Sequence, residues 1–310
     1  MSSLIPIGAD PELLLQNKTG DFIASCGLFG GTKDNPLPLT KNIAIQEDNV
    51  AIEYNIKPTF RASGWLSQHT EAIDLIQKLA NNHGLSISPA TSASFKTENL
   101  GDSRAWIFGC DPDYNVWSCQ TNPRPFSEDE NLRCVGGHIH IGIGTGYSNK
   151  RKIILGRLCD LLIGVPLATY DKDLKRKSLY GKAGAIRFKP YGIEYRTPSS
   201  IWLHTEELTD FVYHMALSAA SNILSSTHFI PIHQFLLQHE TAIIRVINHG
   251  DPTLQKELIT KTINKIKINM TKSEAPRLEM FARREREGWD VFGNEVNNSI
   301  DLERYRSNGI

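Results

Sequence analysis

The stretch Val135-Gly-Gly-His-Ile-His-Ile-Gly-Ile-Gly144 decides the expected fold. It predicts a buried strand, because isoleucines alternate with His138 and His140. Residues two apart in a strand point to the same face, so both imidazoles lie on one side. Glycine weakens a strand unless a backbone or a ligand approaches closely, and four glycines flank this pair. They indicate either a bound ligand or crowding by the protein itself.

Three other strand-like segments carry two polar side chains two positions apart. Isolated carboxylates are strongly disfavoured in an apolar interior. Two carboxylates about 4 Å apart repel by roughly 4 kcal/mol at an effective dielectric near 20. Divalent cations offset this repulsion, and carboxylates with imidazoles suit Mg²⁺ or Mn²⁺. We therefore predict that all four segments meet at one metal site. The further pairs are Asp10 and Glu12, Glu53 and Asn55, and Glu194 and Arg196.

Each pair also has a simpler interpretation when it is taken alone. A single acid at a strand end is commonly a turn cap or a surface group. A His-x-His pair is as often two satisfied core histidines as two ligands, and Glu-x-Arg is more often a cross-strand ion pair than a site. The occurrence of four such pairs in one chain favours a shared site.

Basic residues gather near the last pair. Arg187 stands nine residues before Arg196, across an expected turn at 190–192. Such side chains hold phosphate oxygens and stabilise the charge that develops on a transferred phosphoryl group. The alternative is a solvated basic hairpin. The basic residues in this region are Arg176, Lys182, Arg187, Lys189 and Arg196.

Composition excludes several classes of protein. The 310 residues are 40% hydrophobic and 22% charged, which is ordinary globular usage and not that of a disordered chain. Lys+Arg and Asp+Glu both number 34, so nucleic-acid or membrane partners, which usually select a basic excess, are not expected. The five cysteines form no CxxC motif, which argues against a disulfide framework or a four-thiolate zinc site. With no signal peptide or membrane span in view, we expect a soluble cytoplasmic protein.

Hydrophobic periodicity outlines the order of the elements. Residues 1–62 are strand-rich, with a hairpin at Glu47-Asp48-Asn49, and residues 85–135 are irregular. The pattern predicts two further strands, at 185–189 and 193–197, and a core domain at 1–230 followed by a helical C-terminal extension at 231–310. Helices are expected at 67–82, at 149–170 with a kink or break at Pro166, and at 205–226, 234–248, 253–270 and 275–287.

Four motifs resemble those of carboxylate–amine (COOH–NH2) ligases in the glutamine synthetase/glutamate–cysteine ligase superfamily, most closely the bacteriophage type. The resemblance covers about residues 5–203, and its last block is the most specific. It implies an α+β fold in which a curved, mainly antiparallel sheet forms a funnel with helices on its outer face. The motifs are Gly8-Ala-Asp-Pro-Glu12, Ile52-Glu-Tyr-Asn55, Gly136-Gly-His-Ile-His140, and Tyr191-Gly-Ile-Glu-Tyr-Arg-Thr-Pro-Ser-Ser200 followed by Trp202.

The resemblance also implies a reaction. ATP phosphorylates a substrate carboxylate, and an amine attacks the acyl phosphate to give an amide, ADP and phosphate. Two or three Mg²⁺ or Mn²⁺ ions bridge the ATP phosphates and the acidic strand residues. The partners are then small-molecule or peptide acids and amines, in the host cytoplasm if the chain is phage-encoded, and the oligomeric state is left open.

Residue roles carry over position by position. The first acidic pair departs from relatives that often have two Glu, and only one clear acid stands near residue 53 where some relatives use two, with Glu47 a weak candidate. The number of metal ions is therefore left open. The resemblance implies Asp10, Glu12, Glu53, His138 and Glu194 as metal ligands, and His138, His140, Arg187 and Arg196 as nucleotide-binding residues, with Arg196 and Arg187 also catalytic. Lys182, one of the basic residues near the last pair, is predicted to bind the nucleotide as well. The amine must lose a proton, and Glu53 and Glu194 are both candidates to assist if metal does not occupy them fully; Glu53 is predicted as the catalytic residue.

Three alternatives compete with a ligase. A guanidino phosphotransferase has a related sheet but leaves a stable phosphorylated product. A non-catalytic nucleotide-binding or structural protein would keep the pocket without turnover. A metal-dependent hydrolase that uses His138 and His140 is disfavoured, because it leaves the arginines unexplained.

Overall fold

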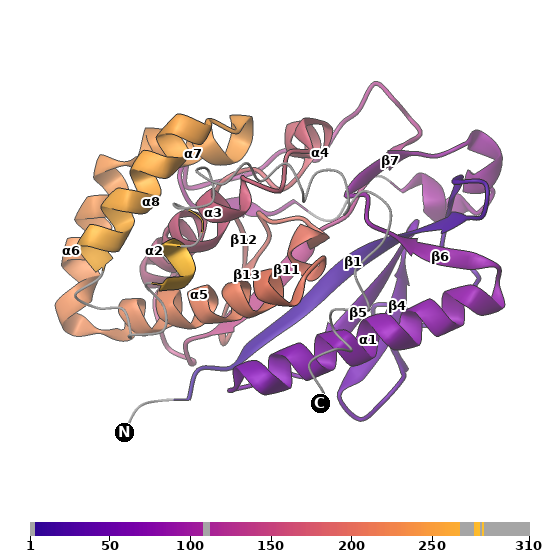
Figure 1. The fold of residues 1–310 in the computed structure, drawn as a ribbon, viewed down its shortest axis with the longest axis horizontal. Helices are drawn as coiled ribbons and strands as arrows, with labels where there is room; N and C mark the ends of the chain where they lie inside the picture. The colour runs from indigo at the N-terminus through magenta and orange to yellow at the C-terminus, as the bar shows by residue number, and fades with distance from the viewer. Residues whose placement is uncertain (1–3, 108–111, 267–275, 280, 282–310) are drawn as a thin grey trace.

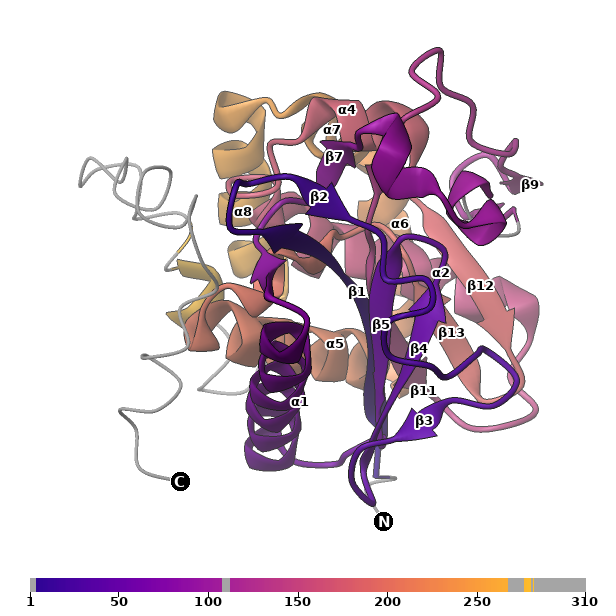
Figure 2. The same ribbon diagram turned by 90° about the vertical axis from the view of Figure 1, so that its right-hand side faces the viewer.

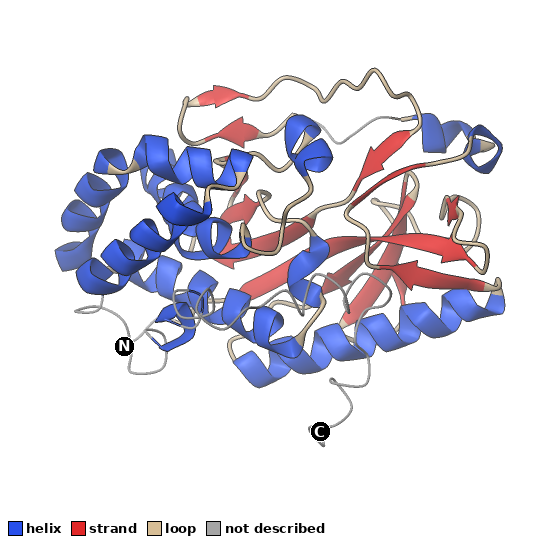
Figure 3. Cartoon of the chain, turned by 45° about the horizontal axis from the view of Figure 1, so that its top comes forward, coloured by secondary structure: helices blue, strands red, loops and turns tan. Residues whose placement is uncertain are grey.

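The computed structural model describes residues 4–107, 112–266, 276–279 and 281. Its centre is an 11-stranded sheet in which every pairing is antiparallel. The sheet is open, because β3 and β9 form its two ends, and eight α-helices in the described ranges surround it (Figure 3). The expected α+β class with a mainly antiparallel sheet is confirmed.

Strand order explains how distant motifs become neighbours. The order is β3-β4-β5-β1-β11-β13-β12-β8-β9, with β2 and β6 also paired to β1. The central strand β1 therefore lies between the second and third motifs, and β13 lies beside β11 (Figure 1). The strands are β1 (Ile7–Asn17), β2 (Phe22–Ile23), β3 (Leu37–Pro38), β4 (Ile43–Asp48), β5 (Ala51–Ile56), β6 (Leu85–Ser88), β8 (Tyr114–Asn115), β9 (Gln120–Thr121), β11 (Gly137–Gly142), β12 (Ala185–Lys189) and β13 (Gly192–Tyr195).

The two faces of this sheet differ in chemistry. One face is apolar and fully buried, with Leu13, Ile52, Ile139 and Ile193 at 2% exposure or less. Alternation along each strand then sends the polar pairs to the opposite face. A small second sheet of β7 (Ser92–Ser94) and β10 (Leu132–Cys134) belongs to the segment that was expected to be irregular.

Both expected hairpins are present. β4 and β5 are joined at Asn49, whose φ of 56° is a left-handed turn conformation that asparagine tolerates. β12 and β13 pair directly around residues 190–191. These two turns set the register that aligns the polar side chains described below.

Helices α1 (Ala62–Asn82) and α5 (Glu206–Leu224) cover the apolar face together (Figures 1 and 2). Both were expected, although α1 begins at residue 62 and not at 67. The Trp65 indole stacks on that of Trp202 at 5.4 Å between ring centroids, and its Nε1 donates to the Thr209 carbonyl at 2.9 Å. The Thr205 hydroxyl caps α5 by accepting from the Leu208 N–H at 3.2 Å.

The chain does not break at Pro166, so the expected break is wrong, while the kink stays a prediction. α2 (Asn149–Cys159) continues through a π-helical segment, Asp160–Gly164, into the short helix α3 (Val165–Leu167). Within the π-turn the Val165 N–H donates to the Asp160 carbonyl, five residues earlier. Such single widened turns are accommodated inside α-helices, and this one precedes the proline whose N–H is missing.

The last described helices pack against the rest of the chain. α6 (Ser226–Gln238) contacts α5 and α2, whereas α7 (Glu240–His249) and α8 (Pro252–Ile266) contact α3. Leu236, Ile247 and Leu258 belong to the same hydrophobic core as the sheet. The helix expected at 234–248 is divided at His239, and the one expected at 275–287 falls largely outside the described residues. The boundary at residue 230 stays a prediction.

Among the described helices, none is both long and apolar enough to cross a lipid bilayer.

The glycines before His138 are required by protein packing. A Cβ at Gly137 would lie 2.2 Å from the Ser199 carbonyl oxygen and 2.4 Å from Trp202 Nε1. We expect Gly137→Ala to lower the free energy of unfolding by about 1–3 kcal/mol through overpacking, as measured by urea denaturation. Gly101→Ala is the matched control, because its nearest neighbour, the Glu98 carbonyl oxygen, would lie 3.8 Å away. Equal stabilities of the two variants would contradict this account.

Candidate active site

The four polar pairs predicted from the sequence project from one face of the sheet. Register pairs Asp10 with His138 across β1 and β11, and Glu12 with Glu53 across β1 and β5. On the other side of β11, His140 pairs with Glu194, which also pairs with Arg187 of β12. Because directly opposed residues share a face, the four strands bring these side chains to one place.

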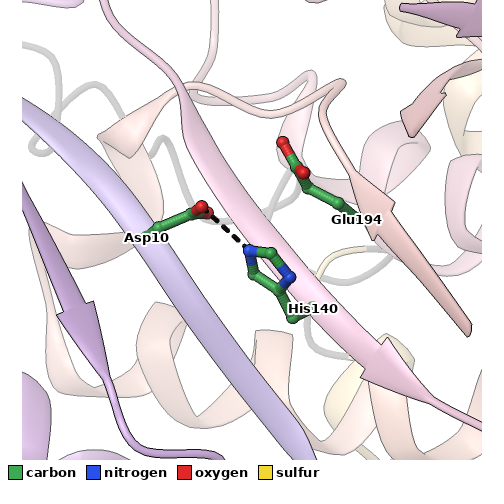
Figure 4. A group of neighbouring side chains, drawn as sticks. All are labelled: Asp10, His140 and Glu194. Carbon is green, nitrogen blue, oxygen red and sulfur yellow. Dashed lines mark ion pairs between the residues drawn. The ribbon is translucent and has the colours of Figure 1, made fainter. Parts of the chain in front are cut away.

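A first cluster consists of Asp10, His140 and Glu194, whose ligand atoms all lie within 4.8 Å of one another (Figure 4). His140 Nε2 lies 2.9 Å from Asp10 Oδ2, and its Nδ1 lies 2.5 Å from the Tyr191 hydroxyl. Burial opposes protonation of His140, but the Asp10 carboxylate outweighs it and raises the imidazole pKa. Asp10 Oδ1 is buried and has no hydrogen-bond partner among the described residues.

A second cluster consists of Glu12, Asp48 and Glu53, with ligand oxygens again within 4.8 Å of one another. Burial, together with the neighbouring Asp48 charge, raises the pKa of Glu12 to about 8. The pKa values of Asp48 and Glu53 are also raised, first by burial. The Gly136 N–H donates to Glu12 Oε2 at 2.7 Å and holds this side chain in place. Three crowded carboxylates form a site that favours either protons or a cation.

Basic side chains surround Glu194. Lys189 Nζ lies 2.7 Å from Glu194 Oε2, and Arg187 Nη1 lies 3.5 Å from Oε1, while Arg196 Nη1 donates to Oε1. Burial works against ionisation of Glu194, yet the positive charges of Arg196 and His140 overcome it and hold the pKa of this carboxyl below its usual range. Glu194 is therefore an anion in a cationic surrounding.

His138 links the two clusters to the arginine. Its Nδ1 lies 3.7 Å from Asp10 Oδ1 and 3.9 Å from Glu12 Oε1, and its Nε2 forms a 2.6 Å hydrogen bond with the Tyr180 hydroxyl. Arg196 Nη2 also donates to that hydroxyl. Burial and the Arg196 charge lower the pKa of His138, so the imidazole is neutral.

Sequence reasoning missed Asp48 and considered Glu47 instead. Glu47 faces away from the cluster: its carboxylate accepts from the N–H groups of the 27–30 loop and pairs with Arg104 at 2.9 Å. Strand parity was the available signal, because Asp48 lies two residues after Gln46, which is opposite Glu53. Asp48 therefore shares the polar face, and Glu47 does not.

Tyr180 and Asp113 were also missed, and no sequence pattern marked them. Asp113 Oδ2 lies 3.6 Å from Arg196 Nε. Tyr180 and Asp113 both line a cavity of about 310 Å³ at the His138 end of the site, together with Arg124 and the exposed Lys182. Lys182 thus lies at the wall of this cavity, which Tyr180 and Asp113 also line.

Arg176 has a structural position in the fold. Its guanidinium is fully buried and donates to the carbonyls of Val135, Thr197 and Pro198 at 2.7–3.2 Å. It ties the end of β13 to the start of β11 and lies outside the polar clusters. The interpretation of this residue as part of a solvated basic hairpin is wrong, because the side chain is enclosed.

A larger cavity, about 990 Å³, lies elsewhere. It is lined in part by Ser88, Asp171, His204 and Gln255 and includes none of the residues of the two acidic clusters. Volume alone therefore does not identify the site, whereas the convergence of acids, imidazoles and arginines does.

The profile of the family described as "Phage phiEco32-like COOH.NH2 ligase-type 2" matches residues 127–284, about half of the chain. The chain belongs to this family. The resemblance read from the four motifs is thus confirmed, and the family description indicates a ligase that joins a carboxyl group to an amine. The matched residues include β11, β12 and β13, whereas β1, β4 and β5 precede them.

Comparisons with individual proteins add less. No curated protein matches the chain. A solved structure described as "Apo GmaS without ligand" aligns with 88% of this chain and 71% of that chain, at 13% identity and a TM-score of 0.42.

Asp160 supports the Arg196 end of this candidate site from the apolar face. Within the π-turn, its carboxylate accepts from Trp117 Nε1 at 2.6 Å, the Tyr195 hydroxyl at 2.8 Å and the Thr197 hydroxyl at 3.1 Å. Tyr195 and Thr197 flank Arg196 in the chain. Burial nevertheless raises the pKa of Asp160 to about 6 from 3.8.

The Asp160 shift predicts a pH-dependent stability. A raised folded-state pKa means that the folded chain binds the proton more tightly, so stability is gained as the pH falls through about 6. We expect the unfolding free energy of the wild type, relative to Asp160→Asn, to be about 1 kcal/mol larger at pH 5 than at pH 8. Chemical denaturation at both pH values measures this difference. Exposed Asp34→Asn is the control, and an Asp160→Asn difference that does not change with pH would contradict the assignment.

Proposed function

We propose that the chain is an ATP-dependent carboxylate–amine ligase that forms an amide through an acyl phosphate and releases ADP and phosphate. The observation that carries this proposal is the junction of two buried acidic clusters with Arg196 and Arg187 on one sheet face. Carboxylates are poor electrophiles and need activation, and phosphoryl transfer is catalysed chiefly by positioning and by charge stabilisation. A site built from acids and arginines supplies both.

The donor atoms fit divalent cations. Asp10 Oδ1 makes no hydrogen bond to the described residues, and the pKa values of Glu12 and Glu53 in the second cluster are raised. Both features are expected of metal-binding carboxylates that lie close together with no cation between them. Oxygen ligands with one imidazole suit Mg²⁺ or Mn²⁺. Asp10, His140 and Glu194 would hold one ion, and Glu12, Asp48 and Glu53 would hold another, with His138 between them. Ions held there would offset the negative charge of the phosphate oxygens.

The arginines act on the transferred group. Arg196 is only 1% exposed and is positioned by Glu194, Tyr180 and Asp113, so its guanidinium is fixed before substrate binds. We assign it to the phosphoryl oxygens, with Arg187 beside it. The neutral His138 contributes a nucleotide contact, and Lys182 contacts the nucleotide from the wall of the 310 Å³ cavity. His140, which was expected to bind the nucleotide, is assigned to the first metal cluster instead.

The amine must lose a proton before it attacks. Glu53 is buried, and its raised pKa makes it a better proton acceptor than an ordinary carboxylate. We assign this role to Glu53 in addition to metal binding. The reaction takes small-molecule or peptide acids and amines as substrates, and we place it in the cytoplasm, that of the host if the chain is phage-encoded.

The assay that tests this function follows its products. Purified protein with Mg²⁺ and ATP should release ADP and phosphate only when both an acid and an amine are supplied. Formation of AMP and pyrophosphate would contradict the acyl-phosphate route. ADP without phosphate, together with a stable phosphorylated amine, would favour a guanidino phosphotransferase instead.

Glu194→Gln should reduce kcat by about 100-fold or more, because the substitution removes the anion that positions both arginines. The fold should survive, since the side-chain shape is kept, and the thermal midpoint reports this. Exposed Glu98→Gln is the control, with unchanged rate. An unaffected rate in Glu194→Gln would exclude this residue from the site.

Asp48→Asn tests the second cluster. We expect the affinity for Mn²⁺ to fall about tenfold or more and the metal-free protein to become more stable, because one of three mutually repelling carboxylates is removed. Mn²⁺ titration followed by electron paramagnetic resonance measures the first effect, and thermal unfolding measures the second. Glu47→Gln should leave the Mn²⁺ affinity unchanged and lower the stability, since Glu47 holds the 27–30 loop. An Mn²⁺ affinity that changes only in Glu47→Gln would reject Asp48 as a ligand.

A further inference from the structure

The polar row of the sheet ends in glycines on one side. Moving along each strand from its ligand to the next residue on the same face, β1 goes from Asp10 to Gly8 and β11 goes from His140 to Gly142. β13 likewise goes from Glu194 to Gly192, and Gly142 and Gly192 are directly paired. Gly8 is paired with His140, so β1 has no side chain beside this ligand, and β11 and β13 have none in the next row.

A cavity of about 220 Å³ occupies this position. Two prolines border it: a Cβ at Gly142 would lie 2.5 Å from Pro6 Cγ, and one at Gly8 would lie 3.3 Å from Pro58 Cγ. The glycines thus make room for prolines, which give the cavity apolar walls. The cavity is lined by Pro6, Asn55, Ile56, Pro58, His140 and Tyr191, among others.

β5 contributes Asn55, two residues after Glu53 on the same face, to the lining of this cavity. Its Nδ2 is buried and makes no hydrogen bond to the described residues. A buried donor without a partner costs about 1–3 kcal/mol. The opposite wall is His140, fixed by Asp10 at 2.9 Å and by Tyr191 at 2.5 Å. The cavity therefore offers apolar walls, one free donor and a direct border with the first metal cluster.

The other end of the site has the opposite character. The 310 Å³ cavity beside Tyr180 carries Lys182 and Arg124, which suit an anionic nucleotide. His138 lies toward that end and His140 toward the glycines, two residues further along β11. The basic cavity complements the charge of a nucleotide. The cavity beside His140 has apolar walls, so we expect it to take the uncharged part of a substrate.

We propose that the 220 Å³ cavity binds the side group of the acid or amine substrate, and that Asn55 determines specificity there. The group is small and uncharged and carries one carbonyl or hydroxyl oxygen that accepts from Asn55 Nδ2. This inference rests on the proposed ligase function for the name of the substrate, but the binding of such a group does not require turnover.

The first test measures binding without ATP or metal. Saturation-transfer difference NMR of the full chain should show binding of propionamide, which joins a short apolar tail to a carbonyl oxygen. Propionate and propylammonium should give weaker signals, because the cavity disfavours charge. Asn55→Leu should lose the propionamide signal, whereas exposed Asn81→Leu should keep it. An equal signal in Asn55→Leu, a stronger propionate signal, or no propionamide binding to the wild type would each overturn the inference.

A second variant keeps the test independent of folding defects. Asn55→Asp replaces the donor with a carboxylate of the same shape, so the preference should change from propionamide to propylammonium. An unchanged preference would also overturn the inference.

Turnover provides the second readout. Once an acid and an amine that release ADP are known, Asn55→Leu should raise KM for the oxygen-bearing substrate about tenfold, the worth of one hydrogen bond, with kcat and the KM for ATP nearly unchanged. An analogue without that oxygen should lose nothing. A raised KM for ATP would overturn the inference. Propionamide binding without any ADP release would instead contradict the proposed ligase function and leave the cavity assignment standing.

Discussion

The repulsion among Glu12, Asp48 and Glu53 is the constraint on which the rest of the structure depends. Three carboxylates within 4.8 Å in a buried position oppose folding unless protons or cations neutralise them. Their raised pKa values express this cost. The continuous apolar core on the opposite face supplies the stability that keeps them together, and its large side chains include Ile7, Leu13 and Leu15 of β1 and Ile52, Tyr54 and Ile56 of β5. The acidic cluster thus lowers the stability of the fold, and the packing on the opposite face of the sheet offsets this loss.

The apolar side of the sheet also fixes the position of Arg196. Arg196 points into the site, while Tyr195 before it and Thr197 after it are anchored to Asp160 on the helical side. Arg176 then fixes the carbonyls of the residues that follow. Both anchors are charged groups enclosed by protein and fully hydrogen-bonded to it, which rigidifies a strand end. A guanidinium fixed in this way is preorganised for a developing charge, which is worth more in catalysis than a flexible side chain of the same charge.

The sequence allowed the polar face of the sheet to be predicted because strand periodicity is strict. Residues two apart share a face whatever the rest of the chain does, so Asp10 with Glu12, and His138 with His140, were found without knowledge of the fold. Choosing between Glu47 and Asp48 required the register of the hairpin, and Tyr180 required tertiary packing of a loop that carries no pattern. The glycines at 136–137 looked like room for a ligand, but they make room for His138, Ser199 and Trp202. The helix break expected at Pro166 is also absent. A π-turn directly before the proline lets the helix continue, and helix propensity alone does not predict such a turn.

The register of β1 decides whether the family assignment accounts for a whole site. The family match covers β11, β12 and β13, which supply the histidines, Glu194 and both arginines. The second acidic cluster comes from strands that precede the match. Pairing of Asp10 with His138 on one edge of β1, and of Glu12 with Glu53 on the other, joins the two parts. A slip of one residue would turn both acids of β1 into the apolar core and leave His138 and His140 without the carboxylates of Asp10 and Glu12. The amide-bond formation proposed for this site would therefore depend on β1 as much as on the strands by which the family is recognised.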